Sequence, residues 1–515
     1  MDPRFRLLNG QQLLLAFVGV SVCYLLAKAI YRIYLSPLSK IPGPWYTAAS
    51  ELWFIWKNLG GGSIFAIHDL HQKYGPYVRI APNTISTADL ESVQKIHSTS
   101  DVYRKSEYYE KLRREVDTLP VITDLESYRH RRRAYGSAFS NSTLSLMEPA
   151  IRRNVDKLIR KIQQVTEAGE KFDLLKWFHL LSLDVLGELC YGLDFGMLQD
   201  EKVHPLVEDA LSFVLLVTIR AYFPIVNRLK RVLSYVPHPK IQRFLRVEDR
   251  VYTFSSWALS NTQHRVHNCK DGKSKITLFS KILDDMNDPD VNVKTKMTMA
   301  MVRQEALMIV AAASDTTAIT GTFLIWVILR HAEIRRKLVD ELRAVTAGSG
   351  ELDGGITDEK LKQLPYLKVV IMEVMRLYCA GQIALERVVP SGGRQIGPYF
   401  LPEETRVCSP IYTLHRDPTV FPDPELFKPE RWINPTKSME VAMLHFGGQS
   451  RPCIGQNLAM TELRLLVAGI LSSCPDIELA DSCTDDSMEV VDHLLINPKS
   501  HKCEVQKRKM EIIKS

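Results

Sequence analysis

The sequence predicts a mainly α-helical protein with a minor β-sheet. Most of the chain shows apolar residues at helical spacing, and residues 298–343 form a long stretch without proline. Strand-like alternation is confined to short runs at residues 77–80 and 84–87 and between residues 395 and 409. We therefore expect helices to form the body of the protein, with a small sheet beside them.

Length, charge and cysteine usage narrow the class of protein. The chain has 515 residues, enough for two or three average domains or for one large enzyme unit with an ample core. Its formal net charge of +7 permits an acidic partner or a membrane surface, and we expect no nucleic-acid partner. The nine cysteines are scattered and form no CxxC pair. This pattern favours a reducing compartment over a disulfide framework or a zinc site.

The N-terminus carries a long apolar run. Residues 13–27 contain no charged side chain, and further apolar positions follow them, so the run is long enough to cross a bilayer as a helix. We expect residues 1–35 to be a single-pass membrane anchor. The alternative is a cleaved signal peptide, since Arg4 and Arg6 precede the run. The cysteine pattern, which does not look secreted, favours the anchor.

A proline-rich stretch follows the anchor. Residues 36–44 read SPLSKIPGP, and prolines at this density fix extended backbone and remove amide donors. We expect a stiff hinge there. Residues 45–515 contain no internal repeat, low-complexity tract or second linker, so we expect them to form a single domain.

The stretch from residue 298 to 343 should form one long helix and the start of another. Residues 307–313 are apolar on every side, which predicts burial. Asp315 and Thr316 then bring an acid and a hydroxyl into this apolar helix. The Thr316 hydroxyl is expected to bond the carbonyl of Ala312, four residues back, and to bend the helix locally. In isolation, a core helix with ordinary back-bonded threonines is the simpler interpretation.

Glu373 and Arg376 share one face of an apolar helix predicted at residues 369–377. The Glu-x-x-Arg spacing alone has little value, because it occurs at several other places in the chain. A buried glutamate and a buried arginine each need a partner, and Arg431 in the downstream segment at residues 429–432 would complete a hydrogen-bonded triad. We expect this triad to lock the fold and to take no part in chemistry.

The strongest signal is the loop FGGQSRPCIG at residues 446–455, which contains Cys453 and runs into a helical pattern at residues 456–471. Its glycines let the backbone approach a flat ligand and let several amides point at one sulfur. The helix N-terminus behind Cys453 favours negative charge on that sulfur, and Arg451 offers a cation to a carboxylate. A haem and its propionates need such a thiolate and such a cation. A small buried hydrophobe is the alternative role for Cys453.

These residues resemble the cytochrome P450 family. Phe446, Arg451, Cys453 and Gly455 match the family's cysteine-ligand loop, FxxGxRxCxG, with Gln449 in place of its second glycine. Other segments resemble further family motifs in the expected order: residues 42–44 in the hinge, Tyr128 and Arg132 for WxxxR, residues 312–317 for AGxDTT with Ala313 in place of glycine, Glu373 to Arg376 for ExxR, and residues 429–432 for PERF.

The resemblance implies a cytochrome P450 fold, with haem b between the long helix and the helix that follows the cysteine loop. Cys453 would be the axial thiolate ligand of the iron, and Arg132 and Arg387 would each reach a propionate. Asp315 and Thr316 would be catalytic residues that deliver protons through water. The other cofactor-binding residues would be Tyr128, Phe446, Arg451 and Gly455, and the structural residues would be Glu373, Arg376 and Arg431.

The resemblance also implies a function. A monooxygenase of this family would insert one oxygen atom from O2 into a lipophilic small molecule, here of terpenoid, alkaloid or polyketide type in secondary metabolism. NADPH-cytochrome P450 reductase would supply the electrons, with cytochrome b5 as a further partner. Arg131 and Arg133, on the more exposed side of their helix, are expected to dock an acidic reductase. The implied location is the endoplasmic reticulum membrane, with the haem-thiolate catalytic domain, residues 45–515, in the cytosol.

Two alternatives to this function stay open. One is a haem-thiolate isomerase or dehydratase that needs no reductase. The other is a non-catalytic haem-binding membrane protein, which would have no use for Asp315 and Thr316 as a pair. Dependence of the reaction on NADPH and O2 would distinguish a monooxygenase from the isomerase or dehydratase. A Thr316→Ala variant with unchanged properties would favour the non-catalytic haem-binding protein.

Overall fold

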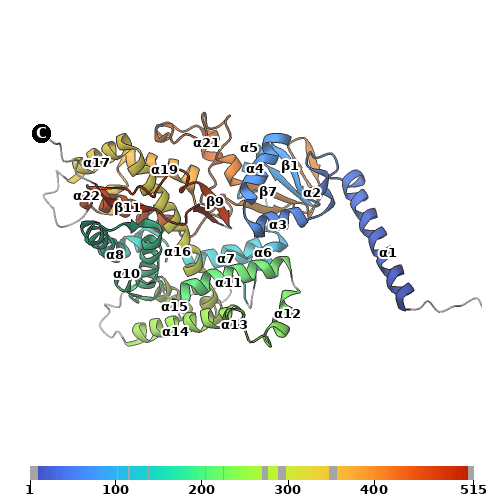
Figure 1. Cartoon of the computed structure of the whole chain (residues 1–515), viewed down its shortest axis with the longest axis horizontal. Coiled ribbons are helices and arrows are strands. Elements are labelled where there is room, and N and C mark those ends of the chain that lie inside the picture. The colour runs from blue at the N-terminus through green and yellow to red at the C-terminus, as the bar shows by residue number, and fades with distance from the viewer. Residues whose placement is uncertain are drawn as a thin grey trace, which may run out of the picture.

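The computed structural model describes residues 10–100, 103–113, 116–136, 138–202, 205–223, 225–268, 277–287, 297–346, 356–493 and 495–508. Arg4 and Arg6, on which the signal-peptide alternative rests, lie outside these ranges. Helices dominate and the strands are short, so the predicted mainly α-helical fold with a minor β-sheet is confirmed (Figure 1).

The helices are Gly10–Ile30 (α1), Tyr31–Leu35 (η1), Trp45–Ala49 (α2), Leu52–Gly60 (α3), Ser63–Tyr74 (α4), Leu90–His97 (α5), Glu107–Lys111 (α6), Leu125–Gly136 (α7), Asn141–Glu167 (α8), Leu174–Leu186 (α9), Gly187–Tyr191 (η2), Met197–Asp200 (α10), Pro205–Tyr222 (α11), Val226–Leu233 (α12), Pro239–Leu245 (α13), Val247–Asn268 (α14), Leu278–Asn287 (α15), Met299–Arg330 (α16), Ala332–Thr346 (α17), Asp358–Leu361 (α18), Pro365–Tyr378 (α19), Ile411–Leu414 (α20), Pro429–Trp432 (η3), Lys437–Ala442 (α21) and Gln456–Ser473 (α22). The strands are Tyr77–Ala81 (β1), Thr84–Thr87 (β2), Phe172–Asp173 (β3), Ala384–Val388 (β4), Arg394–Ile396 (β5), Tyr399–Leu401 (β6), Arg406–Pro410 (β7), Ile477–Leu479 (β8), Val490–His493 (β9), Leu495–Pro498 (β10) and Glu504–Lys507 (β11).

The largest sheet has the strand order β1-β2-β7-β4 and lies at the end of the body from which α1 departs (Figure 1). Its first two strands lie at the predicted strand-like runs and form an antiparallel hairpin, with Tyr77 opposite Thr87. Strand β7 runs parallel to β2 and antiparallel to β4. Arg387 of β4 lies opposite Val407 and is buried. The sheet therefore holds a charged side chain inside the protein.

Helix α16 is the central element of the helical body. Its most extensive contacts are with α9, and it also packs on α14, α19 and α22. The Thr298 hydroxyl accepts the backbone N–H of Met301 and caps the helix N-terminus. A Cβ added at Gly321 would lie 3.1 Å from Leu466 of α22 and 3.3 Å from Phe178 of α9. Glycine at this position therefore lets three helices approach closely.

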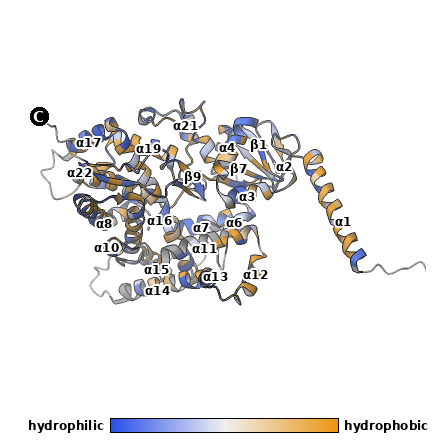
Figure 2. Cartoon of the chain, viewed as in Figure 1, coloured by the Kyte–Doolittle hydropathy of each residue, from blue (hydrophilic) through white to orange (hydrophobic). Residues whose placement is uncertain are grey.

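Helix α1 extends away from the body, and Figure 2 shows that most of its surface is hydrophobic. The segment Gly10–Leu35 is long and apolar enough to cross a membrane, and none of it is buried against the protein. Met299–Arg330 meets the same criteria of length and hydropathy, but it is mostly buried and forms the core helix α16. Among the described residues, α1 with η1 is thus the segment suited to serve as a membrane anchor.

The proline-rich stretch after the anchor packs against the sheet. Leu38 and Ile41 are buried in a small apolar cluster with residues of β2 and β7. Arg79 of β1 donates hydrogen bonds to the carbonyl of Arg32, at 2.7 Å, and to the Ser36 hydroxyl, at 3.2 Å. The hinge is therefore attached to the globular body along its length, and the anchor leaves the body from a defined point.

His71 joins the end of α4 to the sheet. Its Nδ1 lies 2.9 Å from the carbonyl oxygen of Gly75, and its Nε2 lies 2.8 Å from the Ser86 hydroxyl of β2. Burial lowers the pKa of His71 from 6.5 to about 4. Because the folded-state pKa lies below the unfolded value, the stability contributed by neutral His71 is complete above pH 6.5 and is lost as the pH falls toward 4.

We expect the free energy of unfolding of the wild type to fall, relative to that of His71→Gln, as the pH is lowered through this window. The expected slope is about 1.4 kcal/mol per pH unit, because glutamine cannot bind the proton. Urea unfolding at a series of pH values measures it. His238→Gln, which changes an exposed histidine, should show no such relative slope. A stability difference between wild type and His71→Gln that is constant with pH would contradict this account.

Candidate functional site

Two segments far apart in the sequence line one internal cavity with an empty volume of about 780 Å³. Ala312, Ala313 and Thr316 of α16 contribute one part of its wall. Phe446 and Cys453 of the cysteine loop contribute another part, together with the start of α22. A mainly apolar lining with a few polar groups is typical of small-molecule and cofactor sites.

The thiol of Cys453 opens into this cavity, where its surface is exposed although protein atoms surround the site. Its backbone N–H donates to the carbonyl of Phe446 at 2.8 Å and closes the loop. Burial raises the pKa of the Cys453 thiol, while backbone N–H groups of Gly455 and Gln456 and the charge of Arg132 act in the opposite direction. The protein thus directs amides and a cation at this sulfur, and a metal ion bound there would complete its conversion to thiolate.

The glycines of the cysteine loop have distinct roles. Gly447 has φ +81°, a left-handed conformation that favours glycine. A Cβ at Gly448 would lie 2.4 Å from the Cβ of His97, so only glycine allows this approach to α5. Gln449 stands where the FxxGxRxCxG pattern has its second glycine, and it is not among the residues with positive φ. A side chain at this position therefore costs no backbone strain.

Four buried or partly buried basic side chains meet beside the cysteine loop: His97, Lys105, Arg387 and Arg451. Burial lowers the pKa of Lys105 well below its usual range, and Arg387 and Arg451 lower it further. Burial, and then Arg387, lower the pKa of Arg451 to about 10 and that of His97 to about 3. Within this cluster, Arg387 Nε and His97 Nδ1 have no hydrogen-bond partner among the described residues.

Such a cluster of like charges is unfavourable unless an anion joins it. The unpaired Nε–H of Arg387 indicates where that anion would bind. A carboxylate on a group bound in the adjacent cavity would satisfy both the positive charge and this free N–H group. No sequence motif predicts a role for Lys105, because that role depends on Arg387 and Arg451, which lie near it only in the folded protein.

Tyr128 and Arg132, predicted together, both lie on α7 against the cysteine loop. Arg132 Nη1 donates to the carbonyl of Pro452 at 2.9 Å, next to Cys453. The Arg451 guanidinium lies 4.3 Å from the centre of the buried Tyr128 ring and donates to two carbonyls of the segment before α7. Arg132 thus supports the loop backbone, and Tyr128 contacts a second arginine through its ring.

The polar residues of α16 point in two directions. The Thr316 hydroxyl donates to the carbonyl of Ala312 at 3.0 Å, as predicted, and Thr316 lines the cavity. The prediction that residues 307–313 are buried on every side is wrong for Ala312, which is exposed because it faces the cavity. Asp315 does not line the cavity, and its Oδ1 lies 3.2 Å from Nε2 of His179 on α9. The structure therefore separates the two predicted catalytic side chains.

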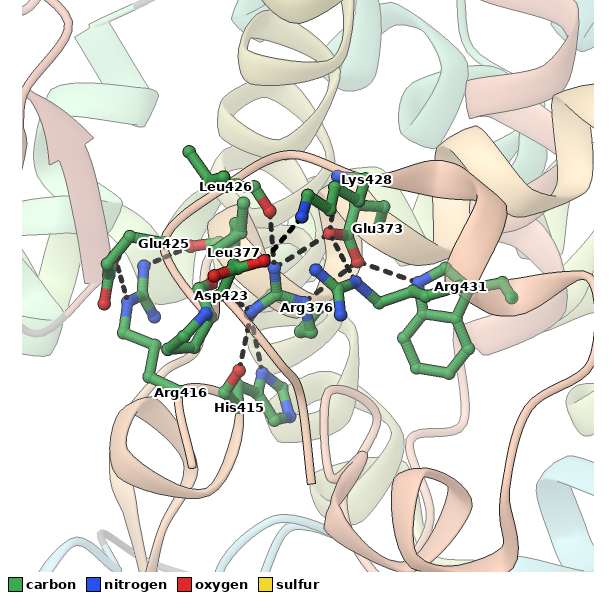
Figure 3. Close-up of polar contacts among 12 residues, drawn as sticks. Glu373, Arg376, Leu377, His415, Arg416, Asp423, Glu425, Leu426, Lys428 and Arg431 are labelled. Atoms are coloured by element: carbon green, nitrogen blue, oxygen red, sulfur yellow. Dashed lines mark hydrogen bonds and ion pairs between the residues drawn. The ribbon is translucent and has the colours of Figure 1, made fainter. Parts of the chain in front are cut away.

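Glu373 is the centre of a fully buried ionic network, which Figure 3 shows. Its Oε1 accepts hydrogen bonds from Arg376 Nη2 at 2.8 Å, Arg431 Nε at 3.0 Å and the Lys428 backbone N–H at 2.9 Å. Its Oε2 accepts from Arg376 Nε at 2.9 Å and from the indole N–H of Trp432 at 2.8 Å. The carboxylate has five donors, which is the condition for keeping a charge buried.

His415 links this network to the cysteine loop. Arg376 Nη1 donates to the His415 carbonyl at 2.8 Å, and the Arg376 carbonyl lies 2.9 Å from His415 Nδ1 (Figure 3). His415 Nε2 accepts the backbone N–H of Leu444 at 3.2 Å, two residues before Phe446. Because Nε2 accepts and a carbonyl can only accept, the proton must be on Nδ1. The sequence offered no signal for His415, since a lone histidine after a strand has no motif.

Two buried carboxyl groups that the sequence reasoning missed also line the cavity. Burial raises the pKa of Glu305 to about 7, although Arg131 opposes the shift, and burial raises the pKa of Glu462 to about 8. Arg131 Nη1 donates to Glu305 Oε1 at 2.8 Å and its side chain is only 10% exposed. The expectation that Arg131 lies on the exposed side of its helix is therefore wrong, because this buried carboxylate draws it inward, whereas Arg133 is exposed.

The residues present fit a flat, anionic, thiolate-ligated group. The cavity has an apolar wall and a single thiol directed into it by two amides. The charge of Cys453 and those of Arg132, Arg387 and Arg451 are all close enough to influence Tyr128. Thiol and cations therefore lie at one site, as a haem with its propionates requires.

Comparisons with known proteins agree with this arrangement. Residues 44–505 match the family model described as Cytochrome P450. The chain is 32% identical over 490 residues to "Cytochrome P450 monooxygenase tazI" of Aspergillus terreus, covering 94% of this chain and 97% of that protein. It is 32% identical over 498 residues to "Cytochrome P450 monooxygenase orf2" of Aspergillus niger, with 96% and 98% covered. It is 30% identical over 488 residues to "Cytochrome P450 monooxygenase stcB" of Emericella nidulans, with 93% and 90% covered.

We expect Glu373→Gln to destabilise the protein by about 3–5 kcal/mol, because it leaves the buried Arg376 charge without its counter-charge. It should also speed hydrogen exchange at the Leu444 amide, which His415 holds. Urea unfolding and hydrogen exchange measure the two effects. The control is Glu430→Gln, which removes a half-exposed carboxylate bonded to Lys337 and should cost less than about 1 kcal/mol. Equal stability losses in both variants would refute the central role of the network.

Proposed function

The chain belongs to the cytochrome P450 family, and we propose that it is a membrane-anchored monooxygenase that inserts one oxygen atom from O2 into a lipophilic small molecule. The observation that carries this proposal is the apolar cavity into which the Cys453 thiol and the Thr316 side chain both open. The family membership gives the haem-thiolate class of enzyme, and the names printed for the three relatives are all those of monooxygenases.

The Cys453 thiolate would hold haem b in the cavity by binding its iron. Phe446 and Gly455 would lie next to it in the cysteine loop, and Arg132 would brace the loop backbone. When bound, the haem supplies the activation of O2 and the transfer of one oxygen atom to the substrate. The remaining functions belong to side chains of the chain itself.

The unpaired basic cluster would hold the haem propionates. Arg387 and Arg451 carry the two buried guanidinium groups, and Arg387 has a free Nε. The Lys105 ammonium lies in the same cluster, close enough to both arginines for their charges to lower its pKa. Arg132, already bonded to the Pro452 carbonyl, is better suited to hold the cysteine loop than to be the main propionate partner.

Thr316 would hold water and oxygen in place beside the cavity wall. Its hydroxyl donates to the Ala312 carbonyl at the cavity wall, and the hydroxyl oxygen keeps lone pairs that could accept a hydrogen bond from a polar group in the cavity. Asp315, which precedes Thr316 in the chain, would pass protons from the α9 side toward the Thr316 hydroxyl. Both residues are therefore proposed as catalytic, Thr316 from within the cavity and Asp315 from outside its wall.

The substrate is proposed to be a terpenoid, alkaloid or polyketide of secondary metabolism. The support is the composition of the cavity wall beyond the cysteine loop, which includes Leu119, Met308 and Ile309 and is mainly apolar. Glu305 contributes a carboxyl group on that side, and its pairing with Arg131 reduces its availability to a ligand. An apolar pocket with few polar groups selects a lipophilic molecule.

The anchor and the exposed surface support the remaining assignments. Helix α1 would place the protein in the endoplasmic reticulum membrane with residues 45–515 in the cytosol. Electrons would come from NADPH through a cytochrome P450 reductase, with cytochrome b5 as a second donor. Arg133, which is exposed on α7, would contribute to docking an acidic reductase surface.

The test is reconstitution of the full chain in membranes with a cytochrome P450 reductase. A panel of terpenoids, alkaloids and polyketides is first screened for binding by shifts of the ferric haem spectrum. For each binder, we expect a product that carries one atom of ¹⁸O from ¹⁸O2 and that forms only with NADPH. Product formed without NADPH would favour the isomerase or dehydratase alternative. Binding without any product would favour a haem-binding protein that lacks catalysis.

Two threonines of α16 provide a matched pair of variants. Thr316 and Thr322 both donate to a carbonyl four residues back, but of the two only Thr316 lines the cavity. We expect Thr316→Val to lower the product formed per NADPH several-fold and to raise hydrogen peroxide release, because the hydroxyl is lost where O2 reacts. Thr322→Val should leave both quantities unchanged. Equal effects of the two substitutions would remove Thr316 from the proposed mechanism.

A further inference from the structure

His179 of α9 faces Asp315 of α16 across the most extensive helix contact of the body. The Asp315 Oδ1 lies 3.2 Å from His179 Nε2, and it also lies 3.4 Å from the Ser314 hydroxyl. The Asp315 side chain is 11% exposed and that of His179 is 23% exposed. The histidine is therefore the more solvent-accessible partner of a mostly buried acid.

The contact made by Nδ1, the second ring nitrogen of His179, shows which ring nitrogens carry a proton. Nδ1 lies 2.9 Å from the carbonyl oxygen of Leu175, one turn earlier on α9. A carbonyl can only accept, so Nδ1 must carry a proton. In a neutral imidazole, Nε2 would then present a lone pair to the carboxylate of Asp315, and the two groups would repel each other. A close contact of this kind requires one more proton between Nε2 and Oδ1.

That additional proton belongs on the histidine at rest. An imidazolium that donates its Nε2–H to a carboxylate makes a charge-assisted hydrogen bond, and the 3.2 Å contact between Nε2 and Oδ1 fits this arrangement of the two side chains. Each charge also stabilises the other at this distance. The pair thus stores one proton on the α9 side of the long helix, one residue away from Thr316 in the cavity.

We propose that His179 is a proton-relay residue that supplies protons to Asp315. In the step, the Nε2–H bond of the imidazolium breaks and the proton passes to Oδ1, which leaves neutral imidazole and a carboxylic acid. Asp315 then gives up the proton toward the cavity, and water returns a proton to Nε2 and restores the imidazolium. The inference rests on the proposed function, because only a reaction in the cavity that consumes protons gives the pair a use.

The first test measures the proton itself and needs no turnover. The holoenzyme is labelled with ¹⁵N-histidine and studied as the diamagnetic carbon monoxide complex at pH 7, with His179→Gln used to assign the resonance. We expect both ring nitrogens of His179 to be protonated. In Asp315→Asn, the carboxamide can donate to Nε2, so His179 should become a neutral Nδ1–H tautomer. A neutral His179 in the wild type, or a signal that Asp315→Asn leaves unchanged, would overturn the proposal.

The second test separates a relay from simple positioning. NADPH oxidation is measured with a cytochrome P450 reductase and no added substrate, in H2O and in D2O. Glutamine keeps an N–H group that can reach Asp315 but carries no titrating proton, and phenylalanine keeps only the ring. We expect His179→Gln and His179→Phe both to slow oxidation about tenfold or more and to increase the solvent isotope effect. Restoration of the wild-type rate by glutamine would mean that His179 only positions Asp315.

His130→Gln is the matched control. His130 lies 4.0 Å from Glu126 on α7, is 29% exposed and does not line the cavity. This variant should oxidise NADPH like the wild type, with the same isotope effect.

A wild type that consumes no NADPH with the reductase would contradict the proposed function instead, and the ¹⁵N measurement would still decide whether the His179 pair holds the proton. The two failures are therefore distinguishable.

Discussion

The need to stabilise the proposed Cys453 thiolate in an apolar cavity is the constraint on which the rest of this account depends. Burial opposes the thiolate, and the pKa of the free Cys453 thiol is accordingly raised. Two features offset this: amides at the start of α22 that donate to the sulfur, and the nearby charge of Arg132. The iron of a bound haem would supply the remaining positive charge. The protein thus prepares the site for its ligand without satisfying it fully.

The same principle explains the buried ionic groups around the cavity. Glu373 is surrounded by five donors, so its charge is balanced within the protein, and through His415 it holds the entry to the cysteine loop. The cluster of Lys105, Arg387 and Arg451 is not balanced, and its unpaired donor on Arg387 awaits an anion. The Glu373 charge is therefore balanced by cations within the fold, whereas the cations beside the cysteine loop leave positive charge that a bound anion could balance.

Much of this arrangement could be predicted from the sequence, because some residues act through local spacing. The cysteine loop, the long helix and the Thr316 bond to Ala312 depend on neighbours in the chain, and the structure has each of them. The inward turn of Arg131 could not be predicted, because it depends on Glu305 far away in the sequence. Nor could the direction of Asp315, since a helical pattern does not show which neighbouring helix offers a partner such as His179.

The most direct test of the central claim is the carbon monoxide difference spectrum of the reduced protein, recorded for the wild type, Cys453→Ser and Cys474→Ser. Cys474 is a buried cysteine just after α22 and outside the cavity lining, so its variant controls for the loss of any one thiol. The account predicts the strongly red-shifted band of thiolate-ligated ferrous haem in the wild type and in Cys474→Ser, and its loss in Cys453→Ser. Persistence of that band in Cys453→Ser, or absence of haem from well-folded wild type, would contradict it.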